Sequence, residues 1–204
     1  MNNDPKDDLQ HIRRMMEQSS RFISLNGLSG VVAGLIALLG AAAALYLFKK
    51  NGVAYFDGYR DVYSLSLVKE LVLLALCILV LAVGFGIFFT VQKNKKQGHT
   101  IWNTVTKHLL LNLAVPLIAG GLFCMALLYH GTMAFVAPAT LVFYGLALVN
   151  ASKYTYSDVQ YLGYCEIFLG IVAMFLIGYG LVFWALGFGV LHIVYGIVMY
   201  RKYK

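Results

Sequence analysis

The feature that most constrains this chain is a run of 42 residues, 159–200, in which Glu166 is the only fully charged side chain. A membrane-spanning helix needs about 20 consecutive apolar residues, so this run is long enough for two such helices. The segment Gly178-Tyr179-Gly180 lies near its middle and is typical of a turn. We therefore expect two membrane helices joined by a tight turn.

The rest of the chain has the same character, because 60% of its 204 residues are hydrophobic and only 12% are charged. Soluble domains carry about twice that charged share. The apolar blocks predict an all-α, polytopic membrane protein with one transmembrane domain, 26–204, and no separate soluble domain. We expect six transmembrane helices arranged as three antiparallel hairpins, with spans at about 27–48, 71–91, 108–129, 132–150, 160–178 and 181–200.

The basic residues predict the orientation. Six spans leave both ends of the chain on one side of the membrane, and that side carries twelve of the sixteen lysines and arginines. Cytoplasmic loops are enriched in these residues. The pattern indicates that both termini are inside, in a multi-pass protein of the inner (cytoplasmic) membrane surrounded by the lipid bilayer.

Residues 1–25 form a polar segment ahead of the first span. Asp4-Pro5 is a favourable helix start, and apolar residues follow at roughly helical spacing with arginines between them. One interpretation is a cytoplasmic amphipathic helix lying on anionic headgroups. The other is a solvated tail, and the sequence leaves both open.

Two titratable groups lie within the last two spans. Both lie on stripes of small residues, which are Gly163, Gly170 and Ala173 around Glu166, and Ala185, Gly189 and Gly196 around His192. Small residues mark the faces where membrane helices touch. We therefore expect Glu166 and His192 to point into the protein and to contact each other, directly or through one water. The alternative to a proton-linked role is a neutral, hydrogen-bonded pair that only fixes helix register.

Other polar residues are expected at a similar depth. Counted along the predicted spans, Asn26, Asn112 and Asn150 belong to the inner half of the membrane or its boundary, as Glu166 and His192 do. These five residues form the predicted polar intramembrane site. The predicted helix-packing glycines are Gly30, Gly34, Gly163, Gly170, Gly189 and Gly196.

Glycine spacing also hints at an internal repeat. Glycines recur seven residues apart as Gly27/Gly34, Gly163/Gly170 and Gly189/Gly196, and Tyr144-Gly145 precedes Tyr195-Gly196 by 51 residues. The spacing suggests that spans three–four and spans five–six are related hairpins, as in transporter folds built from repeats. Chance is the competing explanation, because glycine is frequent in membrane helices.

The last hairpin, with Gly163, Gly170, the turn at 178–180, Gly189 and Gly196, resembles the HdeD-like acid-resistance membrane proteins. These are small six-span proteins built from repeated hairpins with glycines at similar intervals. The resemblance covers about 40 residues, extends weakly to spans three and four, and fits the first hairpin poorly because its outer loop is long. It implies an envelope-stress role without defined catalysis and supplies no catalytic residues.

Other chemistries lack their usual signatures in the sequence. The three cysteines have no close pair, and no HExxH motif or GxxxxGK loop occurs. His192 has no histidine at matching depth with which to hold a haem. No basic nucleic-acid motif is visible. We expect no catalytic residues, no metal, no cofactor and no nucleic-acid partner.

The leading expectation is thus a membrane protein with a structural, interaction or envelope-stress role, and not an enzyme. The alternative is a transporter or channel for a small solute or protons that uses Glu166 and His192. The sequence names no protein partner and leaves homo-oligomerisation open.

Overall fold

The computed structural model describes residues 27–53, 63–97 and 102–203, and the described part of the chain is helical. Six helices are long and apolar enough to cross a membrane, as predicted. The first five spans are formed by α2 (Gly27–Lys50), α3 (Leu65–Gln97), α4 (Thr104–Tyr129), η2 (Met133–Phe135) with α5 (Val136–Ala151) and η3 (Ser152–Tyr154), and α6 (Asp158–Phe175). The sixth consists of α7 (Gly180–Trp184), the π-helix η4 (Ala185–Leu191) and α8 (His192–Lys202). Asn26 and the segment 1–25 lie outside the described residues.

Local chemistry sets several of the helix ends. The α4 helix begins four residues before the predicted position, because the Asn103 side chain caps it by accepting a hydrogen bond of 2.8 Å from the Thr106 backbone N–H. The turns after α4 and α6 contain Gly131 and Gly178, which have positive φ angles of 71° and 101°. Glycine adopts such angles without steric cost, so both tight turns form where the sequence predicted them.

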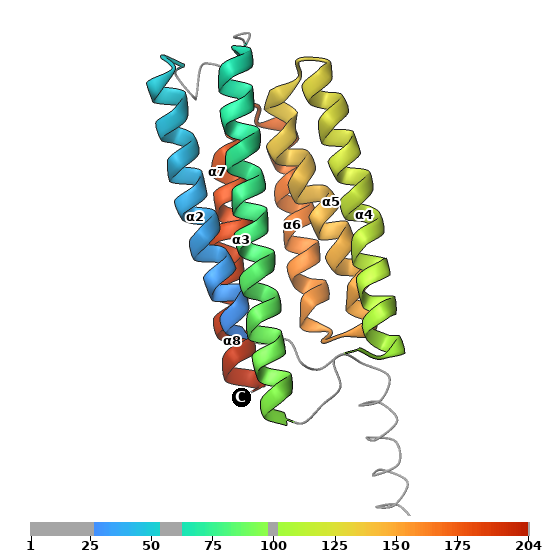
Figure 1. Cartoon of the computed structure of the whole chain (residues 1–204). Helices are drawn as coiled ribbons and strands as arrows, with labels where there is room; N and C mark the ends of the chain where they lie inside the picture. Colours follow the sequence, from blue (N-terminus) through green and yellow to red (C-terminus); the bar gives the residue numbers. More distant parts are fainter. Residues whose placement is uncertain (1–26, 54–62, 98–101, 204) are drawn as a thin grey trace, which may run out of the picture.

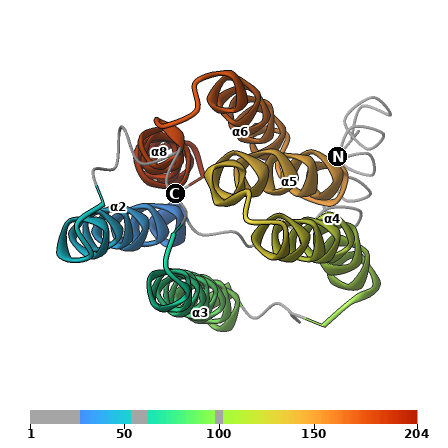
Figure 2. The same cartoon turned by 90° about the horizontal axis from the view of Figure 1, so that it is seen from above.

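Consecutive spans run in opposite directions, and α2 begins at the end of the bundle where α8 finishes (Figure 1). The spans fall into two groups of three. In one group α2 packs against α3 on one side and against η4 and α8 on the other, and in the second α5 packs against α4 and α6 (Figure 2). Spans five and six are neighbours in sequence, yet α6 makes most of its contacts with α5, and α8 makes most of its contacts with α2.

Glycines allow the closest helix approaches, which are α5 with α6 and α2 with α8. A Cβ added to Gly145 would lie 2.6 Å from the Gly163 carbonyl oxygen, and one added to Gly163 would lie 2.8 Å from that of Gly145. In the same way, a Cβ on Gly196 would lie 2.6 Å from the Gly27 carbonyl oxygen. Backbone touches backbone at these points, as in other membrane helix pairs built on small residues.

The two close pairs repeat one another residue by residue. Further along each pair, a Cβ on Gly170 would meet the side chain of Val142 and the carbonyl of Pro138, while one on Gly34 would meet the side chain of Ile193 and the carbonyl of Gly189. The matching residues of α5 and the sixth span are always 51 positions apart, namely Pro138/Gly189, Val142/Ile193 and Gly145/Gly196. The repeat therefore relates α5 to the sixth span, and their partners α6 and α2 correspond as well. The sequence was wrong in relating the hairpin of spans three and four to that of spans five and six, because α6 packs on α5 as α2 packs on the sixth span, while α6 and the sixth span touch little.

Candidate functional site

Glu166 and His192 meet between the two groups of helices. Glu166 comes from the middle of α6 and is 0% exposed, and His192 is the first residue of α8 and is 6% exposed. The imidazole Nδ1 lies 3.4 Å from Glu166 Oε1. The contact expected from the sequence is thus present, and it bridges two spans that otherwise touch little.

The imidazole has two further polar contacts. Its Nδ1 lies 3.0 Å from the Gly187 carbonyl oxygen, and its Nε2 lies 2.8 Å from the Tyr144 hydroxyl. A carbonyl oxygen only accepts, so Nδ1 carries a hydrogen and donates it. In the neutral ring Nε2 is then the acceptor, and Tyr144 donates to it. Tyr144 therefore fixes the imidazole from α5, in the group of helices opposite to that of His192.

The π-helix η4 helps to orient the His192 side chain. It ends at Leu191, one residue before the histidine, and it contains the Gly187 carbonyl that receives the imidazole hydrogen. A Cβ on Gly187 would collide with Glu166 Oε2 and lie 2.6 Å from a methyl of Leu141. Glycine at this position therefore lets the carboxyl group lie against the helix backbone. Short π-helical segments are rare and occur often at functional sites.

The carboxyl group of Glu166 has few polar neighbours. Both of its oxygens are buried, and neither makes a hydrogen bond. An uncompensated charge buried in this way costs several kcal/mol, so states with no net charge are favoured. Two such states exist, a carboxylic acid beside a neutral imidazole and a carboxylate beside an imidazolium. The same proton can therefore lie on either group without changing the net charge of the pair.

A cavity of about 180 Å³ lies beside the histidine. Its polar lining includes Tyr144, His192 and Tyr195, and its remaining wall is mostly glycine, alanine and aliphatic side chains from α2, α3, α5, α6 and α8. Gly27 and Met199 also line it, so it extends toward the end of the bundle where α2 begins and α8 finishes. Glu166 does not belong to this lining, and His192 separates its carboxyl group from the cavity.

Tyr195 brings an unused hydroxyl to the same place. Its hydroxyl oxygen is buried and has no hydrogen-bond partner. Tyr195 corresponds to Tyr144 in the repeat, and both rings pack against the same apolar cluster of Leu148, Val159 and Leu162. Both tyrosines line the cavity; the Tyr144 hydroxyl is bonded to His192, whereas the Tyr195 hydroxyl is buried without a partner.

Two of the predicted asparagines, Asn112 and Asn150, do not join this cluster, and Asn26 lies outside the described residues. The Asn112 amide donates to the His108 carbonyl of its own helix at 2.9 Å, so its polar group is satisfied locally. Asn150 is partly exposed on α5, six residues beyond Tyr144. Sequence reasoning also missed Tyr144, Gly187 and Tyr195. The repeated Tyr-Gly dipeptide was the only signal for the two tyrosines, and Gly187 had none.

A polar clasp joins α6 and α8 at the end of the bundle toward which the cavity extends. Lys202 Nζ lies 2.9 Å from both carboxylate oxygens of Asp158, and the Tyr203 hydroxyl donates to Asp158 at 2.6 Å. Burial, followed by its hydrogen bond to Asp158, raises the pKa of the Tyr203 hydroxyl, which therefore stays protonated as a donor at neutral pH. The ring of Tyr156 lies 4.0 Å from that of Tyr203 and covers the clasp.

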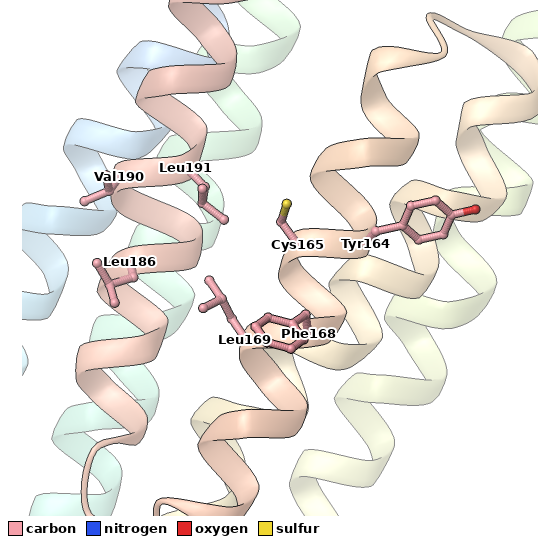
Figure 3. Close-up of a pocket in the computed structure, with 7 residues that line it drawn as sticks. All are labelled: Tyr164, Cys165, Phe168, Leu169, Leu186, Val190 and Leu191. Carbon is pink, nitrogen blue, oxygen red and sulfur yellow. The ribbon is translucent and has the colours of Figure 1, made fainter.

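Elsewhere α6 and the sixth span are separated by an apolar groove (Figure 3). Its volume is about 420 Å³, and its walls include Cys165, Phe168 and Leu169 of α6 facing Leu186, Val190 and Leu191 of η4. The contact of Glu166 with His192 and the clasp are therefore two polar links between these spans. Among the described residues no group of three His, Cys, Asp or Glu side chains is placed to hold a metal ion.

Comparisons with models of protein families, with curated proteins and with solved structures find no match for this chain.

Proposed function

We propose that this protein is a proton-linked transporter or channel for a small solute, with Glu166 and His192 as its proton-binding pair. The observation that supports it is the contact of a wholly buried carboxyl group with a histidine that lines a cavity. Ionisable residues inside a membrane domain are costly and are typical of ion and proton pathways. Histidine is also the side chain whose charge changes most readily near neutral pH.

The orientation belongs to the same proposal. Both termini are cytoplasmic, in agreement with the excess of lysine and arginine on their side, and the cavity then extends toward the cytoplasm. A reporter fused after Lys204 should be active only if it is a cytoplasmic reporter. A reporter inserted at Gly131 should be active only if it is an external one. The reverse pattern would overturn the orientation.

The experiment that tests the function is a proton flux assay. The purified protein is placed in liposomes of phosphatidylethanolamine and phosphatidylglycerol that contain a pH-sensitive dye, and a pH gradient is imposed. We expect the gradient to decay faster than in empty liposomes, and the Glu166→Gln/His192→Gln double variant to abolish the difference. Glu70→Gln is the matched control, because Glu70 lies near the start of α3 and faces Lys50 at 3.9 Å. Equal rates for the wild type and the double variant would refute the proposal.

A second candidate is a structural, interaction or envelope-stress role like the one implied by the HdeD-like resemblance. The repeated glycine contacts favour it, because they give a closely packed bundle. This candidate predicts that loss of the protein sensitises cells to envelope stress, and that the Glu166→Gln/His192→Gln variant restores resistance as well as the wild type does. A variant that fails to restore resistance would favour the proton-linked function instead.

A further inference from the structure

The buried carboxyl group is reached from the cavity by one polar route. Glu166 is 0% exposed, is not part of the cavity lining, and has the His192 imidazole as its polar neighbour at 3.4 Å. His192 and Tyr144 do line the cavity. Among the described residues, a proton that travels between the cavity and Glu166 therefore passes through the imidazole.

The outer nitrogen of the imidazole is covered by Tyr144. Its Nε2 lies 2.8 Å from the Tyr144 hydroxyl, so this hydroxyl is the group that exchanges protons with the histidine. The second hydroxyl on the cavity, that of Tyr195, is buried without a partner. An unsatisfied buried hydroxyl costs free energy, and in natural proteins a bound water commonly supplies its partner.

The cavity has room for such water. Its volume is about 180 Å³, whereas a water molecule occupies roughly 30 Å³ in the liquid and needs two to four polar partners when buried. Tyr144 and Tyr195 provide partners on the same wall. We propose that water in this cavity joins the Tyr195 and Tyr144 hydroxyls, and that the two tyrosines relay protons between the bundle end near Gly27 and the His192–Glu166 pair. This inference rests on the proposed proton-binding role of that pair.

The relay step is balanced. A protonated water in the cavity gives a proton to the Tyr144 oxygen, while Tyr144 gives its own proton to His192 Nε2. His192 then breaks the hydrogen bond from Nδ1 to the Gly187 carbonyl and gives that proton to Glu166 Oε1, which lies 3.4 Å away. One O–H bond forms at Glu166 and one breaks at the water, and the imidazole changes from the Nδ1–H to the Nε2–H tautomer. The tyrosine and the histidine both end neutral.

Hydrogen–deuterium exchange at the Glu166 carboxylic acid tests the relay. The full-length protein, reconstituted in the same liposomes, is transferred into D₂O, and the shift of the carboxylic acid C=O stretch is followed by infrared spectroscopy. Glu166→Gln identifies the band. We expect Tyr144→Phe to slow the exchange about 100-fold, and Tyr195→Phe about tenfold because water can fill part of the gap. Tyr195→Phe should not move the pH at which the band appears, since Tyr195 makes no hydrogen bond to the pair.

Tyr164→Phe is the matched control. It also removes one tyrosine hydroxyl, but from an exposed position on α6 where that hydroxyl contacts Gln160 at 2.6 Å. The exchange rate should therefore be unchanged. Equal exchange in the wild type, Tyr144→Phe and Tyr195→Phe proteins would overturn the relay, and so would the absence of a Glu166 carboxylic acid band at every pH. Exchange needs no net flux, so a protein that fails the flux assay but shows slowed exchange would refute the transport function alone.

Discussion

The two close helix pairs, α5 with α6 and α2 with the sixth span, share their glycine contacts but differ in polarity. At the position of His192, the repeat places Leu141 on α5, which is fully buried. At the position of Glu166 it places Gly30 on α2. The α5 helix thus packs on α6 with an apolar leucine in place of His192, and α2 packs on α8 with a glycine in place of Glu166. Glu166 and His192 therefore do not fix the register within either close pair; their contact joins one pair to the other.

A second difference lies in the helix backbone. The α5 helix is regular from Val136 onward, whereas the matching part of the sixth span is the π-helix η4. The π-helical turn accompanies the Gly187 carbonyl that binds the imidazole, and α5 has no such carbonyl contact at Leu141. The polar site therefore combines Glu166 from the α5–α6 pair with His192 from the pair of α2 and the sixth span. It also includes the π-helix η4, which has no counterpart in α5.

The largest loss of stability is expected for His192→Leu, which gives the sixth span the residue that α5 has at the corresponding position. The change removes the polar neighbour of a wholly buried carboxyl group, which should lower the free energy of unfolding by about 3 kcal/mol. Adding Glu166→Ala should restore part of that loss, because no buried acid is then left alone. Equilibrium unfolding in mixed detergent micelles measures both values. Glu166→Ala is also measured in the wild-type background. If it costs as much stability there as it does in the His192→Leu background, the two side chains are not coupled.

The next largest loss of stability is expected when a glycine at a close helix contact is replaced by alanine. Gly145→Ala and Gly196→Ala each place a Cβ about as close to a facing backbone, so each should cost about 1–3 kcal/mol, with similar values for the two. The same unfolding assay gives the comparison. If one change is tolerated and its counterpart is severe, the two pairs are not energetically equivalent and the repeat is only geometric.

The sequence predicted the spans and the central contact, but not the partners of each helix. Hydrophobic blocks and turn glycines identify six spans because both follow from local chemistry. The small-residue stripes around Glu166 and His192 face α5 and α2 rather than each other, as Gly163 and Gly196 illustrate. A stripe of small residues shows which face of a helix is in contact, but it does not show which helix packs against that face. Tyr144 was missed because membrane tyrosines commonly anchor at interfaces, and Gly187 because a π-helix has no sequence signature of its own.

A smaller effect of opposite sign is expected at Gly84 of α3 and Gly121 of α4, which have no neighbouring helix against them. An added Cβ at Gly84 or Gly121 would meet nothing within 4 Å, so Gly84→Ala and Gly121→Ala should be neutral or should stabilise the helices by up to about 1 kcal/mol. Thermal unfolding in detergent checks this. A marked loss of stability at either position would mean that another surface, such as a second copy of the chain, contacts that face.

The smallest effect on stability is expected at the clasp. Asp158→Asn removes the ion pair with Lys202, whose side chain is 51% exposed, and exposed ion pairs contribute little because water and salt screen them. The melting temperature should fall less than for His192→Leu, Gly145→Ala or Gly196→Ala, and the difference from the wild type should disappear at high salt. Lys202→Met, which leaves Asp158 bonded to Tyr203, is the matched control and should have no larger effect. A melting temperature that falls as far for Asp158→Asn as for His192→Leu would show that the clasp, and not the buried pair, holds α6 to the sixth span.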